Sequence, residues 1–293
     1  MALKISVVIN TLNEEENIER VIKSVGWADE ILVCDMHSED KTAEVAKKLG
    51  AKVIFQRREP IVEKARNSAV LKAEGEWILV LDPDEEVPEA LAERLREITK
   101  GTKQIDYVRI PRKNLIFGRF MEHTGWWPDL NIRFFKKGSV KWTEEIHRPP
   151  QASGEGLDLP VQEEYAILHH SYKTISQFIE RMDRYTTVQA VELNRQDYEF
   201  KWQDLFEKPL NEFLSRFFAM EGYKDGLHGL ALSFLQAFSE LVVYLKLWEK
   251  RNFIDIDIDL EEIKNQKDKS GFTVDYWYKR IEKGGSFLSR LFK

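Results

Sequence analysis

The sequence predicts an α/β protein built on an open, mostly parallel sheet, with helices on both faces of the sheet and a helical region at the C-terminus. Through about residue 100, short apolar runs alternate with segments of helical periodicity. Each apolar run is continuous rather than alternating, which is typical of strands buried on both faces. Beyond His170 the chain becomes a series of long amphipathic stretches, which predicts helices.

The strand and helix segments of the first part follow one another in a regular order. The predicted strands are Ile5–Ile9, Ile31–Asp35, Val53–Phe55 and Trp77–Leu81. The predicted helices cover Ile18–Val25, Ala43–Leu49, Val62–Ala73 and Pro88–Ile98. We expect Asn13 to cap the first helix, Gly50 to end the second and Gly75 to follow the third. Right-handed crossovers bring the carboxyl ends of such strands to one edge, so the polar residues there should share one crevice.

From Tyr107 to Leu168 the pattern changes to short strands separated by aromatic-rich turns. Strands are expected at Tyr107–Ile110, Ile132–Phe135 and Ala166–Leu168, followed by helical stretches at Ile175–Leu193 and Phe213–Trp248. We therefore divide the chain into a sheet domain, residues 1–170, and a helical C-terminal region, residues 171–293.

Composition and charge exclude several classes of protein. Of 293 residues, 43% are hydrophobic and 32% are charged, as in soluble globular proteins, and the net charge of -6 argues against nucleic acid as a partner. The single cysteine, Cys34, lies in an apolar run, which predicts a buried thiol and a reducing compartment. No charged-then-apolar leader precedes Ile5, and charges interrupt the apolar stretch Gly229–Trp248, so we expect a cytoplasmic protein without a membrane span.

Asp82 and Asp84 directly follow the fourth predicted strand. Mg²⁺ and Mn²⁺ prefer carboxylate oxygens, and they often bind one or two of these together with substrate phosphates. An Asp-Pro-Asp turn could instead cap the helix that begins near Pro88. The position after three earlier strand and helix units favours a metal and diphosphate site.

Asp35 and Arg66 are further candidates near the same edge. A carboxylate at the end of a strand can accept hydrogen bonds from a nucleobase or a ribose hydroxyl, whereas Ser38 and Asp40 are expected to cap the following helix. Arg66 could place its guanidinium beside a diphosphate or pair with Glu63 on an exposed helix face, and the spacing leaves both open.

The glycine-rich phosphate loops of other nucleotide-binding sheets are missing from the sequence. Neither G-x-G-x-x-G nor G-x-x-x-x-G-K-[ST] occurs, which argues against Rossmann dehydrogenases and P-loop enzymes. A sheet that binds a nucleotide with paired carboxylates requires a metal ion to neutralise the phosphates.

Together these motifs resemble glycosyltransferase family 2, and in particular its branch of lipopolysaccharide-core glucosyltransferases. The resemblance rests on Val7–Glu15, Val33–Thr42, Ala65–Asn67 and Leu81–Glu85, which occur in the family's order and cover about the first half of the chain. It implies a GT-A fold, a nucleoside-diphosphate-sugar donor, a divalent metal ion (Mg²⁺ or Mn²⁺) and inversion at the anomeric carbon.

The resemblance also assigns roles by position. The residues that it places in the nucleoside pocket are Thr11, Asn13, Glu15 and Asp35. It brings Arg66 to the diphosphate, assigns Asp82 to the ribose and makes Asp84 a metal ligand. His169 follows a short apolar strand, where such enzymes often carry a metal-binding histidine, and is expected as a further ligand through a neutral imidazole nitrogen.

The acceptor side is less regular. Gly125–Asp129 and the strand after it resemble the acceptor-side loop of the family, which implies contacts from Trp126, Trp127 and Asp129 to an acceptor sugar. Tryptophans beside a strand are nevertheless more often core residues.

An inverting transferase needs a carboxylate within hydrogen-bond reach of the acceptor hydroxyl. Glu145 is the predicted base, with Glu144 in reserve, and His147 is expected to contact the acceptor. Relatives usually carry Glu after this histidine, whereas this chain has Arg148, and an exposed acidic turn is the alternative interpretation.

The C-terminal helices carry a wide apolar face between Phe213 and Leu245. Packing against the sheet domain or across a homodimer is the favoured explanation. The alternative is peripheral contact with the inner face of the cytoplasmic membrane, because aromatic and basic residues are mixed between Trp277 and Lys293.

The predicted function is transfer of a hexose from a nucleoside-diphosphate sugar to a saccharide or lipid-linked acceptor in cell-envelope glycan synthesis. A sugar nucleotidyltransferase is one alternative, but it would normally carry a Gly-rich basic loop in place of Thr11–Glu16. A non-catalytic sugar-nucleotide-binding protein is the other, and only the irregular segment Glu144–Arg148 favours it.

Overall fold

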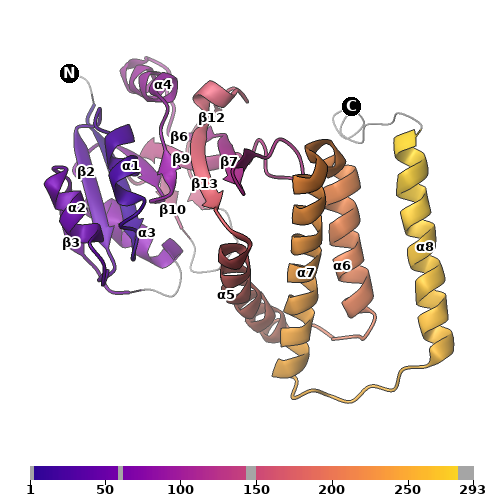
Figure 1. Cartoon of the computed structure of the whole chain (residues 1–293). Helices are drawn as coiled ribbons and strands as arrows, with labels where there is room; N and C mark the ends of the chain where they lie inside the picture. Colours follow the sequence, from indigo (N-terminus) through magenta and orange to yellow (C-terminus); the bar gives the residue numbers. More distant parts are fainter. Residues whose placement is uncertain (1–2, 59–61, 143–149, 283–293) are drawn as a thin grey trace. The chain divides into compact units, whose positions relative to one another are not determined.

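The computed structural model describes residues 3–58, 62–142 and 150–282 (Figure 1). The chain forms two compact units, one of Met1–Leu115 with Pro128–Ser171 and one of Ile116–Trp127 with Tyr172–Lys293. We call them the sheet unit and the helical unit. The structure thus groups residues 116–127 with the helices, and the predicted division into domains at residue 170 stays a prediction.

The sheet unit is organised around a seven-stranded sheet in the order β12-β6-β9-β4-β1-β2-β3. Its strands are β1 (Ile5–Thr11), β2 (Glu30–Asp35), β3 (Lys52–Phe55), β4 (Trp77–Leu81), β6 (Tyr107–Ile110), β9 (Asn131–Lys136) and β12 (Gly156–Asp158). β1 pairs in parallel with β2 and β4, β2 with β3, and β12 with β6, whereas β9 runs antiparallel to β4 and β6. The predicted mostly parallel α/β fold is confirmed.

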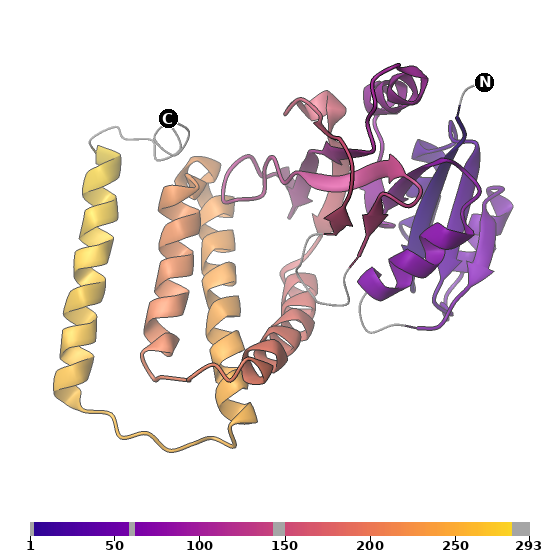
Figure 2. The ribbon, with the colours of Figure 1, turned by 180° about the vertical axis from the view of Figure 1, so that it is seen from behind.

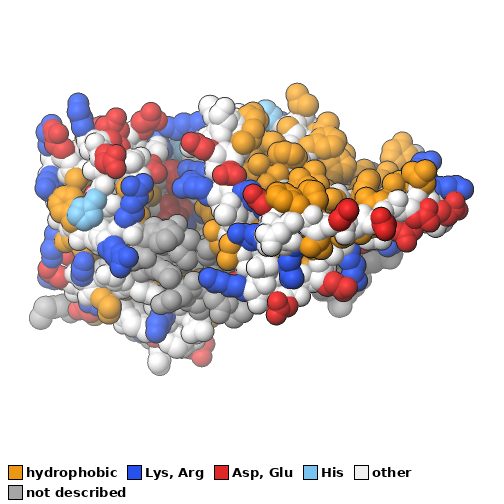
Figure 3. All heavy atoms as spheres, turned by 90° about the horizontal axis from the view of Figure 1, so that it is seen from below, with side chains coloured by type: hydrophobic (Ala, Val, Ile, Leu, Met, Phe, Trp, Pro, Cys, Tyr) orange, Lys and Arg blue, Asp and Glu red, His pale blue; other side chains and the backbone are white. Residues whose placement is uncertain are grey.

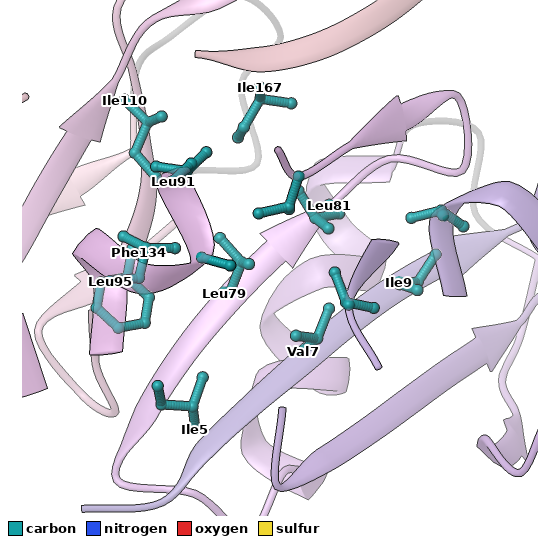
Figure 4. Close-up of a cluster of buried hydrophobic side chains, with 14 of the residues drawn as sticks. Ile5, Val7, Ile9, Leu79, Leu81, Leu91, Leu95, Ile110, Phe134 and Ile167 are labelled. Carbon is teal, nitrogen blue, oxygen red and sulfur yellow. The ribbon is translucent and has the colours of Figure 1, made fainter. Parts of the chain in front are cut away.

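Helices cover both faces of this sheet because successive strand residues point to opposite sides. The helices are α1 (Ile18–Ser24), α2 (Thr42–Lys48), α3 (Val62–Lys72) and α4 (Glu89–Lys100). Val7 and Ile9 belong to the core cluster that includes Leu91 of α4, and Figure 4 labels these three side chains among the members of the cluster. Val8 points the other way and packs with Ala69 of α3.

Two smaller sheets are present beside the seven-stranded one. β5 (Glu85–Glu86), β13 (Ile167–Tyr172), β7 (Arg112–Ile116) and β8 (Arg119–Phe120) form a four-stranded sheet in the order β5-β13-β7-β8. β10 (Val140–Lys141) pairs with β11 (Gln151–Ala152), and Glu163–Tyr165 is a 3-10 turn, η1. The antiparallel register of β5 and β13 places His169 opposite Glu85, next to the turn that carries Asp84.

The helical unit contains α5 (Ile175–Arg195), α6 (Asp204–Leu214), α7 (Gly226–Lys250) and α8 (Leu260–Glu282). α6 and α7 lie side by side, as Figure 2 shows from behind. The π-helical segment η2 (Ser215–Ala219) and the 3-10 turn η3 (Gly222–Asp225) separate them. The continuous helical stretch predicted over Phe213–Trp248 is therefore wrong.

The break between α6 and α7 has a clear backbone cause. Glu221 and Gly226 have positive φ angles of 56° and 62°, which no regular helix contains. Gly229 of α7 packs so closely on the turn that an added Cβ would lie 1.8 Å from the carbonyl oxygen of Gly222. Backbone therefore packs directly on backbone at the start of α7.

Within the described part of the chain, the helix over Gly222–Lys250 is long and apolar enough to cross a membrane, judged by length and composition alone. Only 33% of its most apolar window is buried in the protein. Figure 3 shows hydrophobic side chains gathered on the surface of the helical unit. The exposed apolar residues of α7 are Leu227, Phe234, Phe238 and Leu245.

Candidate active site

The carboxyl ends of β1 and β2 meet at Asp35, which is fully buried. Its Oδ2 accepts hydrogen bonds from the hydroxyls of Thr11 (3.1 Å) and Ser38 (2.7 Å), and its Oδ1 accepts from the Ser38 backbone N–H (2.8 Å). A carboxylate offers about four lone-pair positions. Asp35 is therefore held rigidly and keeps acceptor capacity for a ligand N–H or hydroxyl.

Asn13 joins the loop after β1 to the loop after β2. Its Oδ1 accepts a hydrogen bond from the backbone N–H of Glu39 (2.8 Å), while its own backbone N–H donates to the Ser38 hydroxyl (2.9 Å). The expectation that Asn13 caps α1 is wrong, because its φ of 55° turns the chain here and Asn17 occupies the cap position. The expected capping role of Ser38 is wrong too, because its hydroxyl bonds Asp35 and Asn13.

Glu15 makes a second reciprocal connection between these loops. Its carboxylate accepts from the backbone N–H of Lys41 (3.0 Å), and its own N–H donates to Asp40 (3.1 Å). Asp40 also accepts from the backbone N–H of Thr42 (3.0 Å) at the start of α2, although Lys41 rather than Asp40 occupies the cap position. The loops that carry Thr11, Asn13 and Glu15 therefore form one hydrogen-bonded wall with Asp35.

Asp82, at the end of β4, lies between arginines from separate elements. Arg66 of α3 pairs with its Oδ1, and Arg133 of β9 pairs with its Oδ2 at 2.8 Å. Arg133 also contacts Glu85 Oε1 at 2.7 Å, and Glu85 Oε2 accepts from the Asp82 backbone N–H at 2.9 Å. Arg66 is buried, which excludes the alternative of an exposed arginine on the helix surface.

These ion pairs decide the charge of Asp82. Burial alone would raise its pKa, but the positive charges of Arg133 and Arg66 outweigh burial and hold the pKa well below its usual range. Burial likewise opposes the charge of Arg133, yet Asp82 and then Glu85 raise the pKa of this guanidinium. Asp82 is therefore a fixed anion before any ligand binds.

Asp129 anchors the neighbouring part of the cluster. Its Oδ2 accepts from Arg112 Nε (2.7 Å) and from Asn114 Nδ2 (3.1 Å), and its Oδ1 accepts from Asn131 Nδ2 (3.0 Å). Burial would raise the pKa of Asp129, but the charge of Arg112 and the hydrogen bonds lower it overall. The structure thus places the predicted acceptor residue Asp129 in a half-buried polar network of the sheet unit.

Asp84 and His169 come together as the sequence predicts. Both are buried, and His169 Nε2 lies 3.5 Å from Asp84 Oδ2. The other ring nitrogen of His169, Nδ1, lies 2.6 Å from Asn114 Oδ1. Within the residues that the structure describes, no group of three or more His, Cys, Asp or Glu side chains could hold a metal ion. Asp84 and His169 thus bring one carboxylate and one imidazole together at this point.

The remaining predicted site residues are not joined to this cluster by the structure. Trp126 and Trp127 belong to the helical unit, where Trp126 packs edge-on against Tyr172 (6.3 Å between ring centroids) and Trp127 against Phe120 (5.3 Å). The predicted base and its neighbours lie outside the described residues: Glu144, Glu145 and His147.

Sequence reasoning missed the basic and amide members of the cluster. Arg133 left a signal, because a charged residue inside the apolar run Ile132–Phe135 must find a partner when the strand is buried. Arg112 and Asn114 left none, because nothing in their local sequence distinguishes them from an exposed polar strand. Glu85 appeared only as part of the acidic motif, although it is fully buried.

The parallel sheet and the carboxylates at its edge define an α/β enzyme with a GT-A fold. Residues 6–152 match the profile of Glycosyl transferase family 2, and this chain belongs to that family. The predicted family and the predicted enzyme class, a glycosyltransferase, are confirmed. Membership also argues against the nucleotidyltransferase and non-catalytic alternatives.

Several individual proteins are similar to this chain. An uncharacterized glycosyltransferase of Rickettsia typhi is 28% identical over 289 residues, which span 92% of this chain and 98% of the relative. A dolichol-phosphate mannosyltransferase of Pyrococcus furiosus is 33% identical over 112 residues, or 35% of this chain and 32% of the relative. The crystal structure of S. aureus TarS 1-349 is 18% identical, covers 88% of this chain and 94% of that chain, and gives a TM-score of 0.43.

Proposed function

We propose that this glycosyltransferase is an inverting, metal-dependent hexosyltransferase that uses a nucleoside-diphosphate sugar and a saccharide or lipid-linked acceptor in cell-envelope glycan synthesis. One observation carries the metal dependence. A carboxylate oxygen of Asp84 and a ring nitrogen of His169 lie 3.5 Å apart in a buried setting, and the other ring nitrogen is committed to Asn114. Acceptor groups that face each other in this way favour a cation between them.

The donor set suits Mg²⁺ or Mn²⁺. Such ions are often bound by one or two protein groups together with substrate phosphates, and Asp84 and His169 would supply the protein share. Once bound, the ion would neutralise negative charge on a diphosphate leaving group. Thiolate ligands, which other metals prefer, are missing from the described residues, since Cys34 is buried among apolar strands.

The protein's own residues would hold the rest of the donor. Arg66 is already directed at the acidic edge by Asp82, so its guanidinium can share its charge with a diphosphate. Asp82 is assigned to the ribose, and its arginine partners keep it ionised as an acceptor for hydroxyl groups. Thr11, Asn13, Glu15 and Asp35 would surround the nucleoside through the wall between the first loops.

The acceptor assignment rests on sequence and on the helical unit. Glu145, or Glu144 in its place, would take the proton of the acceptor hydroxyl, and Trp126, Trp127, Asp129 and His147 would contact the acceptor. The exposed apolar residues of α7 support a lipid-linked acceptor, because such a face can contact a membrane surface from the cytoplasm. A homodimer through the same face is the competing explanation.

Donor binding tests this proposal first. A panel of nucleoside-diphosphate sugars with and without Mn²⁺ should contain one that raises the melting temperature only with metal, because a ligand at 100 times its Kd stabilises by about 2.7 kcal/mol. Asp84→Ala and His169→Gln should remove the metal-dependent part. Asp158→Asn, in an exposed ion pair with Arg109, serves as the matched control and should change nothing. A panel without any metal-dependent shift would contradict the proposal.

Transfer assays then test the base and the stereochemistry. Glu145→Gln should bind the donor normally yet lose about 100-fold or more in rate, as expected for removal of a general base. If Glu144→Gln lost the transfer rate to this extent and Glu145→Gln did not, the role of general base would belong to Glu144. Product of retained anomeric configuration would refute the inverting mechanism.

A further inference from the structure

We propose that Asn114 and Asp129 are positioning residues that fix the orientation and tautomer of His169, so that its Nε2 presents a lone pair toward Asp84. This inference rests on the proposed metal site. It concerns residues to which neither the family motif nor the sequence assigns this role. One chain of hydrogen bonds within the sheet unit connects Asp129, Asn114 and His169.

Asp129 sets the first step. Its Oδ2 is 3.1 Å from the side-chain nitrogen of Asn114, and a carboxylate with a lowered pKa can only accept hydrogen bonds. Arg112 and Asn131 hold the same carboxylate from other directions. The amide nitrogen of Asn114 must therefore face Asp129, and its carbonyl oxygen must face the opposite way.

Asn114 sets the second step. β7 and β13 are neighbours in the four-stranded sheet, and this pairing brings Asn114 Oδ1 to 2.6 Å from His169 Nδ1. Asn114 is fully buried and His169 is 7% exposed, so water does not substitute for this contact. An amide oxygen only accepts, and Nδ1 must therefore carry the hydrogen.

The imidazole follows from these constraints. A neutral ring with hydrogen on Nδ1 has its lone pair on Nε2, which is the nitrogen that lies 3.5 Å from Asp84 Oδ2. A partner that accepts from the distal ring nitrogen also fixes the ring plane and raises the basicity of the ligating nitrogen. If the Asn114 amide were reversed, its NH₂ group would face the N–H of His169 Nδ1. Its carbonyl oxygen would then face the carboxylate of Asp129, and both contacts would be unfavourable.

The tautomer can be measured without metal. At pH 8.5, long-range ¹H–¹⁵N correlation spectra of the ¹⁵N-labelled full chain should show His169 with hydrogen on Nδ1. The signal is assigned by its loss in His169→Gln. In Asn114→Leu the preference for Nδ1–H should disappear. The exchanged pair Asn114→Asp/Asp129→Asn keeps an acceptor beside Nδ1 and should restore the preference.

Mn²⁺ affinity is the second readout, measured by electron paramagnetic resonance of free Mn²⁺ in the presence of a nucleoside diphosphate. Asn114→Leu should weaken Mn²⁺ binding about 10-fold or more, as for other partners of metal-bound histidines. The exchanged pair should recover most of this loss, and the control Asp158→Asn should bind as wild type.

The outcomes separate this inference from the proposed function. Hydrogen on Nε2 in the wild type, or an Asn114→Leu variant with unchanged tautomer and unchanged Mn²⁺ affinity, would overturn the positioning role. A wild type that binds no Mn²⁺ with any nucleoside diphosphate would overturn the metal site itself. Cooperative unfolding of each variant shows that a lost signal does not come from a lost fold.

Discussion

The sheet unit buries charge, whereas the helical unit exposes apolar side chains. In the sheet unit Asp35 and Glu85 are fully buried and Arg133 is 5% exposed, while on α7 Leu227 is 77% exposed and Phe234 58% exposed. Both patterns run against the usual preferences, by which charges stay in water and large apolar groups leave it. Such exceptions mark the places where a protein meets something other than solvent.

The two units differ in whether these unusual side chains already have partners within the protein. In the sheet unit Asp82 and Glu85 are paired with arginines, and Asp35 accepts hydrogen bonds from Thr11 and Ser38. The apolar residues of α7 recur at spacings of about one and two helical turns, which places them on one side of the helix. The first unit is therefore preorganised, whereas the second exposes an apolar face among the described residues of α7.

The largest expected effect tests the buried pairing. Arg133→Met should lower the free energy of unfolding by about 3–5 kcal/mol, because it leaves Asp82 and Glu85 buried without this partner. Arg109→Met breaks the exposed pair with Asp158 and should cost about 0–1 kcal/mol. Denaturant unfolding of both variants measures the difference. Equal losses would show that burial of the pair is irrelevant.

The apolar face of α7 should matter for association rather than for stability. Phe234→Gln/Phe238→Gln should change the unfolding free energy by about 0.5 kcal/mol per site or less, as for exposed positions. Leu232→Ala, on the buried side of the same helix, should cost about 2–5 kcal/mol.

Cosedimentation with lipid vesicles and analytical ultracentrifugation identify the partner of that face. The double variant should lose vesicle binding about 10-fold or more. Phe234 is 58% exposed and Phe238 48% exposed, so burying the exposed half of each ring contributes about half of the roughly 1.5–3 kcal/mol of a fully buried side chain. Loss of a dimer with unchanged vesicle binding would instead assign the face to a second copy. If neither vesicle binding nor self-association changed in the double variant, the exposed apolar residues of α7 would have no role in association.

A smaller effect depends on pH. The folded-state pKa of Asp129 lies below its unfolded value, so its ionised form contributes stability above about pH 4, and this contribution is lost as pH falls through the folded pKa. Asp129→Asn should therefore cost about 1.5–3 kcal/mol at pH 7. The difference from wild type should shrink steadily below pH 4 in unfolding curves. A difference that does not vary with pH would mean that the charge contributes nothing.

The smallest effect concerns the thiol in the core of the sheet unit. Burial raises the pKa of Cys34 to about 12, so the thiolate is almost absent at pH 8. A disulfide reagent should label the native protein negligibly over hours and label it fully after unfolding. Rapid labelling of the native chain would show that the sheet opens readily near β2.

The sequence was sufficient for the parallel strands because their side chains are apolar on both faces. β4 was predicted with its observed bounds, and β2 to within one residue. The break between α6 and α7 could not be predicted in the same way. The glycines and the Asp225-Gly226 pair in Met220–Gly226 are typical of a turn, but the close approach of Gly222 and Gly229 depends on packing between segments.

The site residues show the same contrast between local motifs and contacts that depend on the folded chain. Asp35, Asp82, Asp84 and Arg66 stand in local motifs, and the structure places Asp82 against Arg66 and Asp84 beside His169. Asn114 meets His169 across 55 residues of sequence, so no local pattern could indicate the contact. Asn13 was assigned to the nearest helix by spacing, but the neighbouring loop provides its hydrogen-bond partner instead.

The antiparallel strand β9 beside β4 has a consequence for how the chain folds during synthesis. Arg133 reaches Asp82 across 51 residues and Glu85 across 48, so the acidic edge is made well before this arginine leaves the ribosome. Until then Asp82 and Glu85 lack the guanidinium of Arg133, and β4 lacks its antiparallel neighbour β9. Long-range pairing of this kind slows folding and prolongs exposure of unpaired strand edges. We therefore expect nascent chains that end before β9 to depend on chaperones.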